Sequence, residues 1–223
     1  NNNTGYGLVG NSFFKTTDGG TNWNNYGAPV ENVKTARFDF INENIGFALV
    51  GGDEGTSGNT GSVFKTINGG LNWIQMNPGY EIIDEDLVSI DFIDENIGFI
   101  SGGYNRRKTM KTTDSGKNWT KVSDQVFGKI QFINEQDGYA NRIGTYFGAM
   151  YKTTDGGNTW NISIELEGED INDFHFIDED NGYFVGDQAL IYKTNDGGTT
   201  WKKLNIPYDW YTNVKFYLKN VGY

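Results

Sequence analysis

The stretch FFKTTDGGTNW, residues 13–23, sets the repeat of this chain. Related runs are FKTINGGLNW at 64–73, MKTTDSGKNW at 110–119, YKTTDGGNTW at 151–160 and YKTNDGGTTW at 192–201. Their tryptophans lie 50, 46, 41 and 41 residues apart along the chain. A catalytic group is normally needed once, so a residue set copied five times at near-constant spacing indicates a repeated structural unit.

A second motif keeps step with the first. It reads FINENIGF at 40–47, FIDENIGF at 92–99, FINEQDGY at 132–139 and FIDEDNGY at 176–183, with a degenerate copy, FYLKNVGY, at 216–223. The N-terminal NNNTGY matches its second half. We therefore predict one array and a single domain over residues 1–223.

The copy between residues 173 and 204 shows the expected strands. DFHFI alternates apolar and polar residues with period two, DEDNG supplies turn residues, and YFVG, ALIYKT and TTWKKLNI follow as further strands. Four antiparallel strands per repeat predict an all-β fold, a β-propeller of five four-stranded blades closed by pairing of the N- and C-terminal strands. The N-terminal and C-terminal copies of the second motif contain the same few positions of the repeat, although a closed ring needs each position once. The alternative is therefore that this chain is a piece of a longer array.

The repeated turn residues have structural uses. An aspartate carboxylate accepts backbone N–H groups in a turn, glycine permits positive φ, and a tryptophan fills the space between blades. We prefer this interpretation to a ring of catalytic carboxylates. The residues are Asp18, Asp114, Asp155 and Asp196, with Asn68 in the second copy, and Trp23, Trp73, Trp119, Trp160 and Trp201.

The pattern Thr-x-Asp-x-Gly-x-x-Trp resembles the Asp-box, or BNR repeat. The longer unit FIDEDNGYFVGDQALIYKTNDGGTTW, residues 176–201, resembles the photosystem II assembly/stability factor-like family of propellers. That resemblance covers essentially the whole chain and implies an exported or cell-surface bacterial protein. Asp-boxes also occur in sialidases, xyloglucan-cleaving enzymes and sortilin-type receptors, so the resemblance leaves both binding and catalysis open.

Composition narrows the function further. The chain has 223 residues, 29 acidic and 18 basic side chains and a formal charge of −11, which disfavours nucleic acid as a partner. It has no cysteine and one histidine, so we expect no disulfide, no metal site and no cofactor. No apolar run reaches the length of a membrane span, and we expect a monomer without membrane insertion.

Catalysis is the less favoured interpretation. A sialidase-like activity implies three arginines around a substrate carboxylate. The chain has only four arginines, two of which, Arg106 and Arg107, are adjacent in sequence. Arg37 lies in TARFDF, and the Arg-Ile-Pro element associated with the first sialidase arginine is absent. Other glycosidases need two placed carboxylates, and most acidic residues here fall in turns. We therefore predict a non-catalytic module that binds a protein or a cell-surface glycan, with a carbohydrate-active hydrolase as the alternative.

The binding surface is expected where the copies differ. The connections between second and third strands and between repeats vary in length, and they share one end of the strands, here called the irregular-loop face. Tyrosine, tryptophan and arginine are the usual anchors of binding surfaces, although such rings also cap blade ends. The candidates are Tyr80, Tyr104, Arg106, Arg107, Arg142, Tyr146, Tyr208, Trp210 and Tyr211.

A second candidate is a polar row on the first strand of each repeat. These residues precede the shared phenylalanine and are Asp39, Asp91, Gln131, His175 and Lys215. Two positions earlier stand Arg37, Ser89, Lys129, Asp173 and Asn213. First strands line the axis of a propeller, so we predict two stacked polar rings held by ion pairs and water, with a small polar ligand as the alternative.

Overall fold

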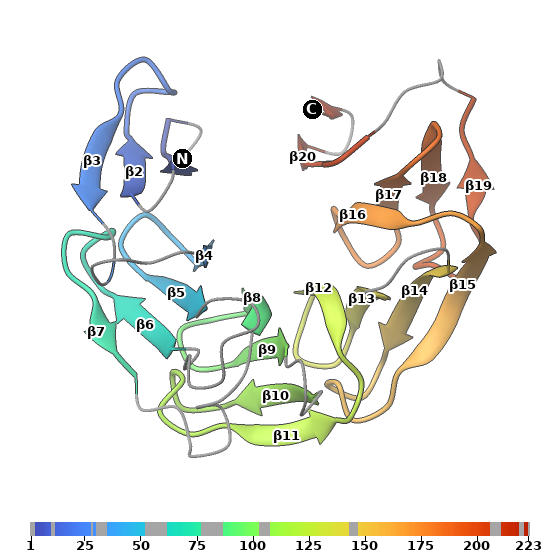
Figure 1. Cartoon of the computed structure of the whole chain (residues 1–223), viewed down its shortest axis with the longest axis horizontal. Helices are drawn as coiled ribbons and strands as arrows, with labels where there is room; N and C mark the ends of the chain where they lie inside the picture. The colour runs from blue at the N-terminus through green and yellow to red at the C-terminus, as the bar shows by residue number, and fades with distance from the viewer. Residues whose placement is uncertain are drawn as a thin grey trace. The chain divides into compact units, whose positions relative to one another are not determined.

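The computed structural model describes residues 3–9, 12–27, 29, 35–51, 62–76, 87–102, 108–142, 147–205, 211–218 and 221–222. Every regular element in these ranges is a β-strand, and all sheets are antiparallel (Figure 1). The chain divides into two compact units, Asn1–Lys121 and Val122–Tyr223, and each is described by itself.

The N-terminal unit contains three sheets. The first has three strands, β1 (Gly5–Val9), β2 (Ser12–Thr16) and β3 (Asn24–Gly27). The second has β4 (Thr35–Phe40), β5 (Gly46–Gly51), β6 (Ser62–Thr66) and β7 (Ile74–Gln75). The third has β8 (Leu87–Phe92), β9 (Gly98–Gly102), β10 (Lys108–Thr112) and β11 (Thr120–Ser123), whose last residues pass into the second unit.

The C-terminal unit continues the same order. One sheet has β12 (Phe127–Phe132), β13 (Gly138–Arg142), β14 (Phe147–Thr153) and β15 (Asn161–Glu167). The next has β16 (Ile171–Phe176), β17 (Gly182–Gly186), β18 (Leu190–Thr194) and β19 (Lys202–Lys203). A two-stranded pair, β20 (Phe216–Leu218) and β21 (Val221–Gly222), ends the described chain.

The propeller blade predicted from the sequence is confirmed. DFHFI, YFVG and ALIYKT correspond to β16, β17 and β18, while the fourth strand, β19, is shorter than TTWKKLNI. Pairing of the terminal strands would join the two units, so ring closure stays a prediction, as does the single domain over 1–223.

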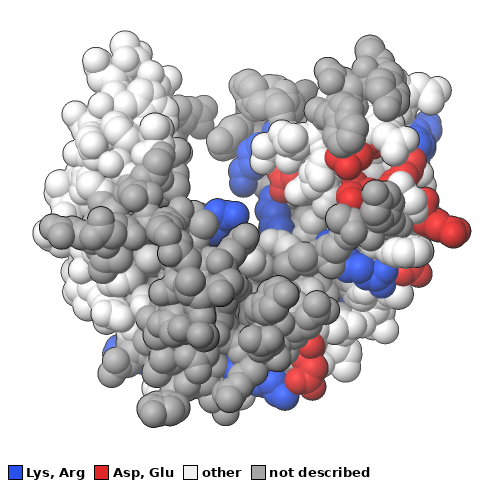
Figure 2. Space-filling model, in the orientation of Figure 1, with Lys and Arg blue, Asp and Glu red and all other residues white. Residues whose placement is uncertain are grey.

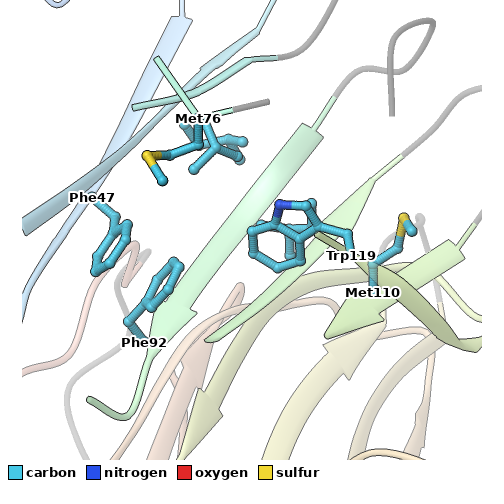
Figure 3. Packing of buried hydrophobic residues seen from close by; sticks show 8 residues of the cluster. Phe47, Met76, Phe92, Met110 and Trp119 are labelled. Carbon is cyan, nitrogen blue, oxygen red and sulfur yellow. The ribbon is translucent and has the colours of Figure 1, made fainter. Parts of the chain in front are cut away.

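Aromatic stacking explains the second motif. In four copies, the ring that follows the motif glycine stacks on the shared phenylalanine of the following sheet in the same unit, as Phe47 does on Phe92, with 3.4 Å between ring centroids (Figure 3). Trp119, which precedes β11 of the sheet that contains Phe92, packs edge-on against the Phe92 ring with an angle of 85° between the ring planes. Met76 and Met110 belong to the same buried cluster. The equivalent stacks are Tyr6 on Phe40, Tyr139 on Phe176 and Tyr183 on Phe216.

The motif glycine is required by close approach of its own sheet's phenylalanine. A Cβ atom placed on this glycine would lie 2.5–2.7 Å from that ring, well inside van der Waals contact. The pairs are Gly46 with Phe40, Gly98 with Phe92, Gly138 with Phe132 and Gly182 with Phe176. Glycine and aromatic together therefore join each blade to the next one within a unit.

Candidate functional site

The repeated aspartate closes its own turn. In the last copy, the Thr194 hydroxyl donates to Asp196 Oδ1 at 2.8 Å, and the backbone N–H of Thr200 donates to the same oxygen at 2.9 Å. The backbone N–H of Gly198 donates to the Thr194 hydroxyl at 2.9 Å. All five copies share the threonine-to-aspartate and glycine-to-threonine bonds, with Asn68 taking the aspartate's part.

These hydrogen bonds favour the charged carboxylate. The hydroxyl and backbone N–H of Thr200 lower the pKa of Asp196 to about 2, and donors on Asn22 lower the pKa of Asp18 to about 2. The pKa values of Asp114 and Asp155 are lowered by their own turns in the same way. The carboxylates thus serve the turn that carries them.

The repeated tryptophans and lysines also pack within the fold, although among the described residues the buried Nε1 of Trp73 has no hydrogen-bond partner. The indole N–H groups of Trp23, Trp119 and Trp160 donate to the glycine carbonyl of their own turn. Trp201 donates instead to the hydroxyl of Ser163, at 2.8 Å. The lysine of each KT pair lies over the aromatic ring of the second motif, as Lys152 lies 5.6 Å from the ring centroid of Tyr139.

The polar row on the first strands binds the backbone of the following sheet. Asp39 Oδ2 accepts the backbone N–H of Phe92 at 2.5 Å. Gln131 pairs with both backbone groups of Phe176, at 2.8 and 2.9 Å. His175 Nε2 donates to the carbonyl of Phe216 at 2.9 Å. Asp91 and Lys215 occupy the corresponding positions on β8 and just before β20.

His175 is neutral at pH 7. Burial lowers its pKa to about 4, and the charge of Lys215 acts in the same direction. Because Nε2 donates to a carbonyl, the ring carries its proton there, which suits a positional contact between sheets. The row as a ligand site stays a prediction.

The second polar row contains an ion pair. Lys129 Nζ lies 2.6 Å from Asp173 Oδ1 and 2.6 Å from the carbonyl oxygen of Phe174. The other carboxylate oxygen, Asp173 Oδ2, accepts the backbone N–H of Val214 at 2.8 Å. These bonds connect three successive elements, β12, β16 and the segment before β20, so the pair holds neighbouring sheets together.

Arg142, a candidate of the irregular-loop face, is held by hydrogen bonds at its guanidinium. Its Nη1 donates to Glu165 Oε1 at 2.7 Å, and its Nη2 donates to the hydroxyl of Tyr151 at 2.8 Å. The bond to Tyr151, followed by that to Glu165, raises the pKa of Arg142. Phe147, which begins β14 nearby, is 53% exposed and its carbonyl accepts from the same guanidinium.

Tyr211 belongs to a different set of contacts on this face. Its backbone N–H donates to the carbonyl of Gly186, and its carbonyl accepts from Asn172 Nδ2 at 2.9 Å. Asn172 also donates to Asp187 in the β17–β18 turn. The hydrogen-bond partners given above for Arg142 and for Tyr211 have no residue in common. The other seven anchors, Tyr80, Tyr104, Arg106, Arg107, Tyr146, Tyr208 and Trp210, lie outside the described residues.

Two further residues of this face, Phe147 and Glu165, lie in variable connections predicted from the sequence, residues 141–148 and 165–170, but were not among the predicted anchors. Phe147 is 53% exposed, and an aromatic residue in a predicted loop was a usable signal. Glu165 pairs with Ala149 in the ladder between β14 and β15, whose register shifts between Met150 and Tyr151, and from there it accepts from Arg142. A bulge of this kind leaves no clear trace in the sequence. In Figure 2 acidic and basic side chains lie interspersed over the strands of the C-terminal unit.

Within the described ranges, no group of three or more His, Cys, Asp or Glu side chains is placed to hold a metal ion. The same part of the chain contains no helix long and apolar enough to cross a membrane.

Comparison with known proteins identifies the family. The protein-family model described as photosynthesis system II assembly factor YCF48 matches residues 54–169 and 161–223 of this chain. The photosystem II assembly lipoprotein Ycf48 of Synechococcus sp. (strain CC9902) is 31% identical over 112 residues, which are 48% of this chain. The chain spans only 32% of that relative's length.

Solved structures share the fold. YCF48 from Cyanidioschyzon merolae matches with a TM-score of 0.62 at 17% identity, covering 95% of this chain and 72% of that one. YCF48 bound to D1 peptide matches with a TM-score of 0.54 at 15% identity, covering 100% and 86%. An ancestral GH74 enzyme matches with a TM-score of 0.64 at 15% identity, covering 96% and 31%. From the family match over most of its length, the chain belongs to the family of the photosynthesis system II assembly factor YCF48.

Proposed function

We propose that this chain is a non-catalytic module that binds a segment of another protein through its irregular-loop face. The observation that carries the proposal is the commitment of the repeated residues to the fold. The turn carboxylates accept donors from their own turns, and the motif aromatics are stacked between sheets. Recognition is left to the residues that differ between copies.

The relatives support a protein partner. One solved relative is described as YCF48 bound to D1 peptide, which makes an extended peptide the first ligand class to test here. The curated relative is a lipoprotein of a bacterium, and we extend an exported location to this chain on that basis. Recognition of a cell-surface glycan, the other half of the sequence prediction, has no comparable support.

The carboxyl groups argue against the hydrolase alternative. A glycosidase needs an acid catalyst whose pKa is raised toward neutrality. Among the described residues, each carboxyl with a resolved pKa shift has it lowered, and each belongs to a repeated turn. Similarity to GH74 enzymes at 14–15% identity concerns the fold alone.

A capture experiment tests the proposal. The intact chain is immobilised, and binding is measured for a synthetic D1 peptide and for proteins of the host extract. The double variant Phe147→Ser/Trp210→Ala should retain about a tenth of the captured partner, because aromatic anchors dominate binding energy. Thr113→Ala, an exposed substitution at the other end of the strands, is the control and should capture normally.

The controls separate folding from binding. Both variants should melt within about 2 °C of the parent chain, since the side chains of Phe147 and Thr113 are exposed. Equal capture by the double variant and the control would contradict the assignment to the irregular-loop face. Hydrolysis of a glycan by the parent chain would contradict the non-catalytic assignment.

A further inference from the structure

The second copy of the repeated turn differs from the other four. Ile67, Leu71 and Ile74 stand at positions that are polar in every other copy. The polar counterparts are Thr17, Thr21 and Asn24, then Thr113, Lys117 and Thr120, then Thr154, Asn158 and Asn161, and finally Asn195, Thr199 and Lys202. Asparagine replaces aspartate in this copy too, so residues 66–76 contain no ionisable side chain.

These three apolar side chains lie in solvent. Ile67 is 64% exposed, Leu71 is 62% exposed and Ile74 is 61% exposed. Single exposed apolar residues are ordinary, but three from one turn and the strand after it form a concentration that marks interaction sites. The turn does not require apolar side chains at these three positions, because the other four copies form the same turn with polar residues.

A cavity of about 820 Å³ opens beside Ile67. Its apolar wall includes Tyr6 and Phe40, whose stacked rings have centroids 3.8 Å apart, together with Ile41 and Ile45. The lining residues come from the start of β1 and the residue before it, from the end of β4 and the β4–β5 turn, and from the β6–β7 turn, all within the N-terminal unit. This volume lies within the usual range for ligand-binding clefts.

The charge of the cavity is negative. Glu43 is exposed, and it is the one acidic or basic side chain among the described lining residues. Tyr6 stays protonated, because burial and then the Glu43 charge raise its pKa to about 12. The nearby cation, Lys15, is buried, and its Nζ donates to the backbone carbonyl of Glu43 at 2.7 Å. An apolar wall with a carboxylate at its rim complements an apolar group next to a cation.

We propose that this cavity, which Ile67 lines, forms together with Leu71 of the same connection a second binding surface for an extended peptide that carries an apolar side chain next to a lysine or arginine. The cavity accepts the apolar side chain, Glu43 pairs with the basic one, and the exposed aliphatic residues extend the contact. The β4–β5 and β6–β7 turns lie at the end of the strands away from the irregular-loop face. The surface is therefore independent of the function proposed above.

Peptide titration of the isotope-labelled intact chain by NMR tests this surface. The probes are Ac-Gly-Phe-Lys-Gly-NH2 and its glutamate counterpart Ac-Gly-Phe-Glu-Gly-NH2. The lysine peptide should shift the amide signals of residues 41–45 and 67–71, and it should bind about tenfold more tightly than the glutamate peptide. Absence of shifts at both turns up to about 10 mM peptide, or equal affinities for the two peptides, overturns the proposal.

Substitutions locate the contact. Ile67→Thr/Leu71→Thr restores the residues of the first copy and should weaken the lysine peptide about tenfold. Glu43→Gln should abolish most of the preference for lysine over glutamate. The matched control is Ile162→Thr, which changes an isoleucine 53% exposed in the other unit and should bind like the parent. An unchanged peptide affinity in the double variant overturns the proposal. The proposal is also overturned if the parent chain binds neutral phosphatidylcholine vesicles and the double variant does not, because that result would assign the exposed apolar residues to a membrane.

Discussion

Replacing Tyr139 by alanine should lower the free energy of unfolding by about 4 kcal/mol. Tyr139 is 1% exposed, and its ring stacks on Phe176 with 3.3 Å between centroids. Its hydroxyl lies 3.2 Å from the carbonyl of Glu179 and 3.1 Å from that of Gly197. Alanine would leave a cavity between two blades and remove the partner of these groups.

Two related variants separate the contribution of the Tyr139 hydroxyl from that of the stacked ring. Tyr139→Phe keeps the stack and loses only the hydroxyl, so about 1 kcal/mol is expected. Tyr183→Ala removes the equivalent ring of the next blade, which is half-buried and stacks on Phe216 at 4.3 Å, and it should cost clearly less than Tyr139→Ala. Urea denaturation followed by tryptophan fluorescence measures all three. If Tyr139→Ala lowers the free energy of unfolding by less than Tyr183→Ala does, then Tyr139 does not hold the blades together.

The motif glycine gives the second large effect. Gly138→Ala should destabilise the chain by about 2 kcal/mol, because the new Cβ would lie 2.7 Å from the Phe132 ring. That ring meets Trp160 edge-on at 5.9 Å and has little room to move. The control is Gly7→Ala, where a Cβ would meet the Trp23 ring at an ordinary 3.4 Å, and less than about 0.5 kcal/mol is expected.

A double-mutant cycle checks the stated cause. In a Phe132→Leu background the same Gly138→Ala change should cost much less, because the planar ring that blocks the Cβ is gone. Guanidinium denaturation of the four proteins gives the coupling energy. Additive effects would show that Phe132 is not the reason for the glycine.

Local patterns were enough to predict the blades. The alternation in DFHFI and the turn residues of the repeat fixed the strands of the sheet containing β16, β17 and β18. The role of Asp196 also followed from its position, since an aspartate in a tight turn finds backbone donors nearby. These features depend on neighbours along the chain, which the sequence displays.

The polar row shows what the sequence did not display. Asp39, Gln131 and His175 were expected to face one another around an axis, yet the bonds observed go to the backbone of the following sheet. The physical reason is that first strands are sheet edges, whose unpaired N–H and C=O groups require partners. Which edge a side chain reaches depends on how sheets pack, and the repeat alone does not encode it.

The candidate binding residues were predicted less completely. Arg142 was found from its type, but its partner Glu165 depends on a register shift between two strands. The exposed residues Ile67 and Leu71 lie in a turn whose pattern is common to all five copies, so the shared motif did not single them out. In a repeat protein the departures from the common pattern are the better guide to a binding surface.

The pH dependence of stability follows from the turn aspartates. Their folded-state pKa values lie below the ordinary 3.8, so the unfolded chain takes up protons first as the pH falls. The stability they contribute is fully present above about pH 4 and is lost as the pH falls through about 2. The same carboxylates would behave differently if they faced a ligand in a cleft.

Carboxyl-carbon NMR titration of Asp18 and Asp196 in the intact chain is the most direct test that the repeated residues serve the fold. The geometry predicts a pKa of about 2 for both groups, unchanged when calcium or oligosaccharide is added. A pKa at or above the ordinary 3.8, or a value that moves when either ligand binds, would contradict the account.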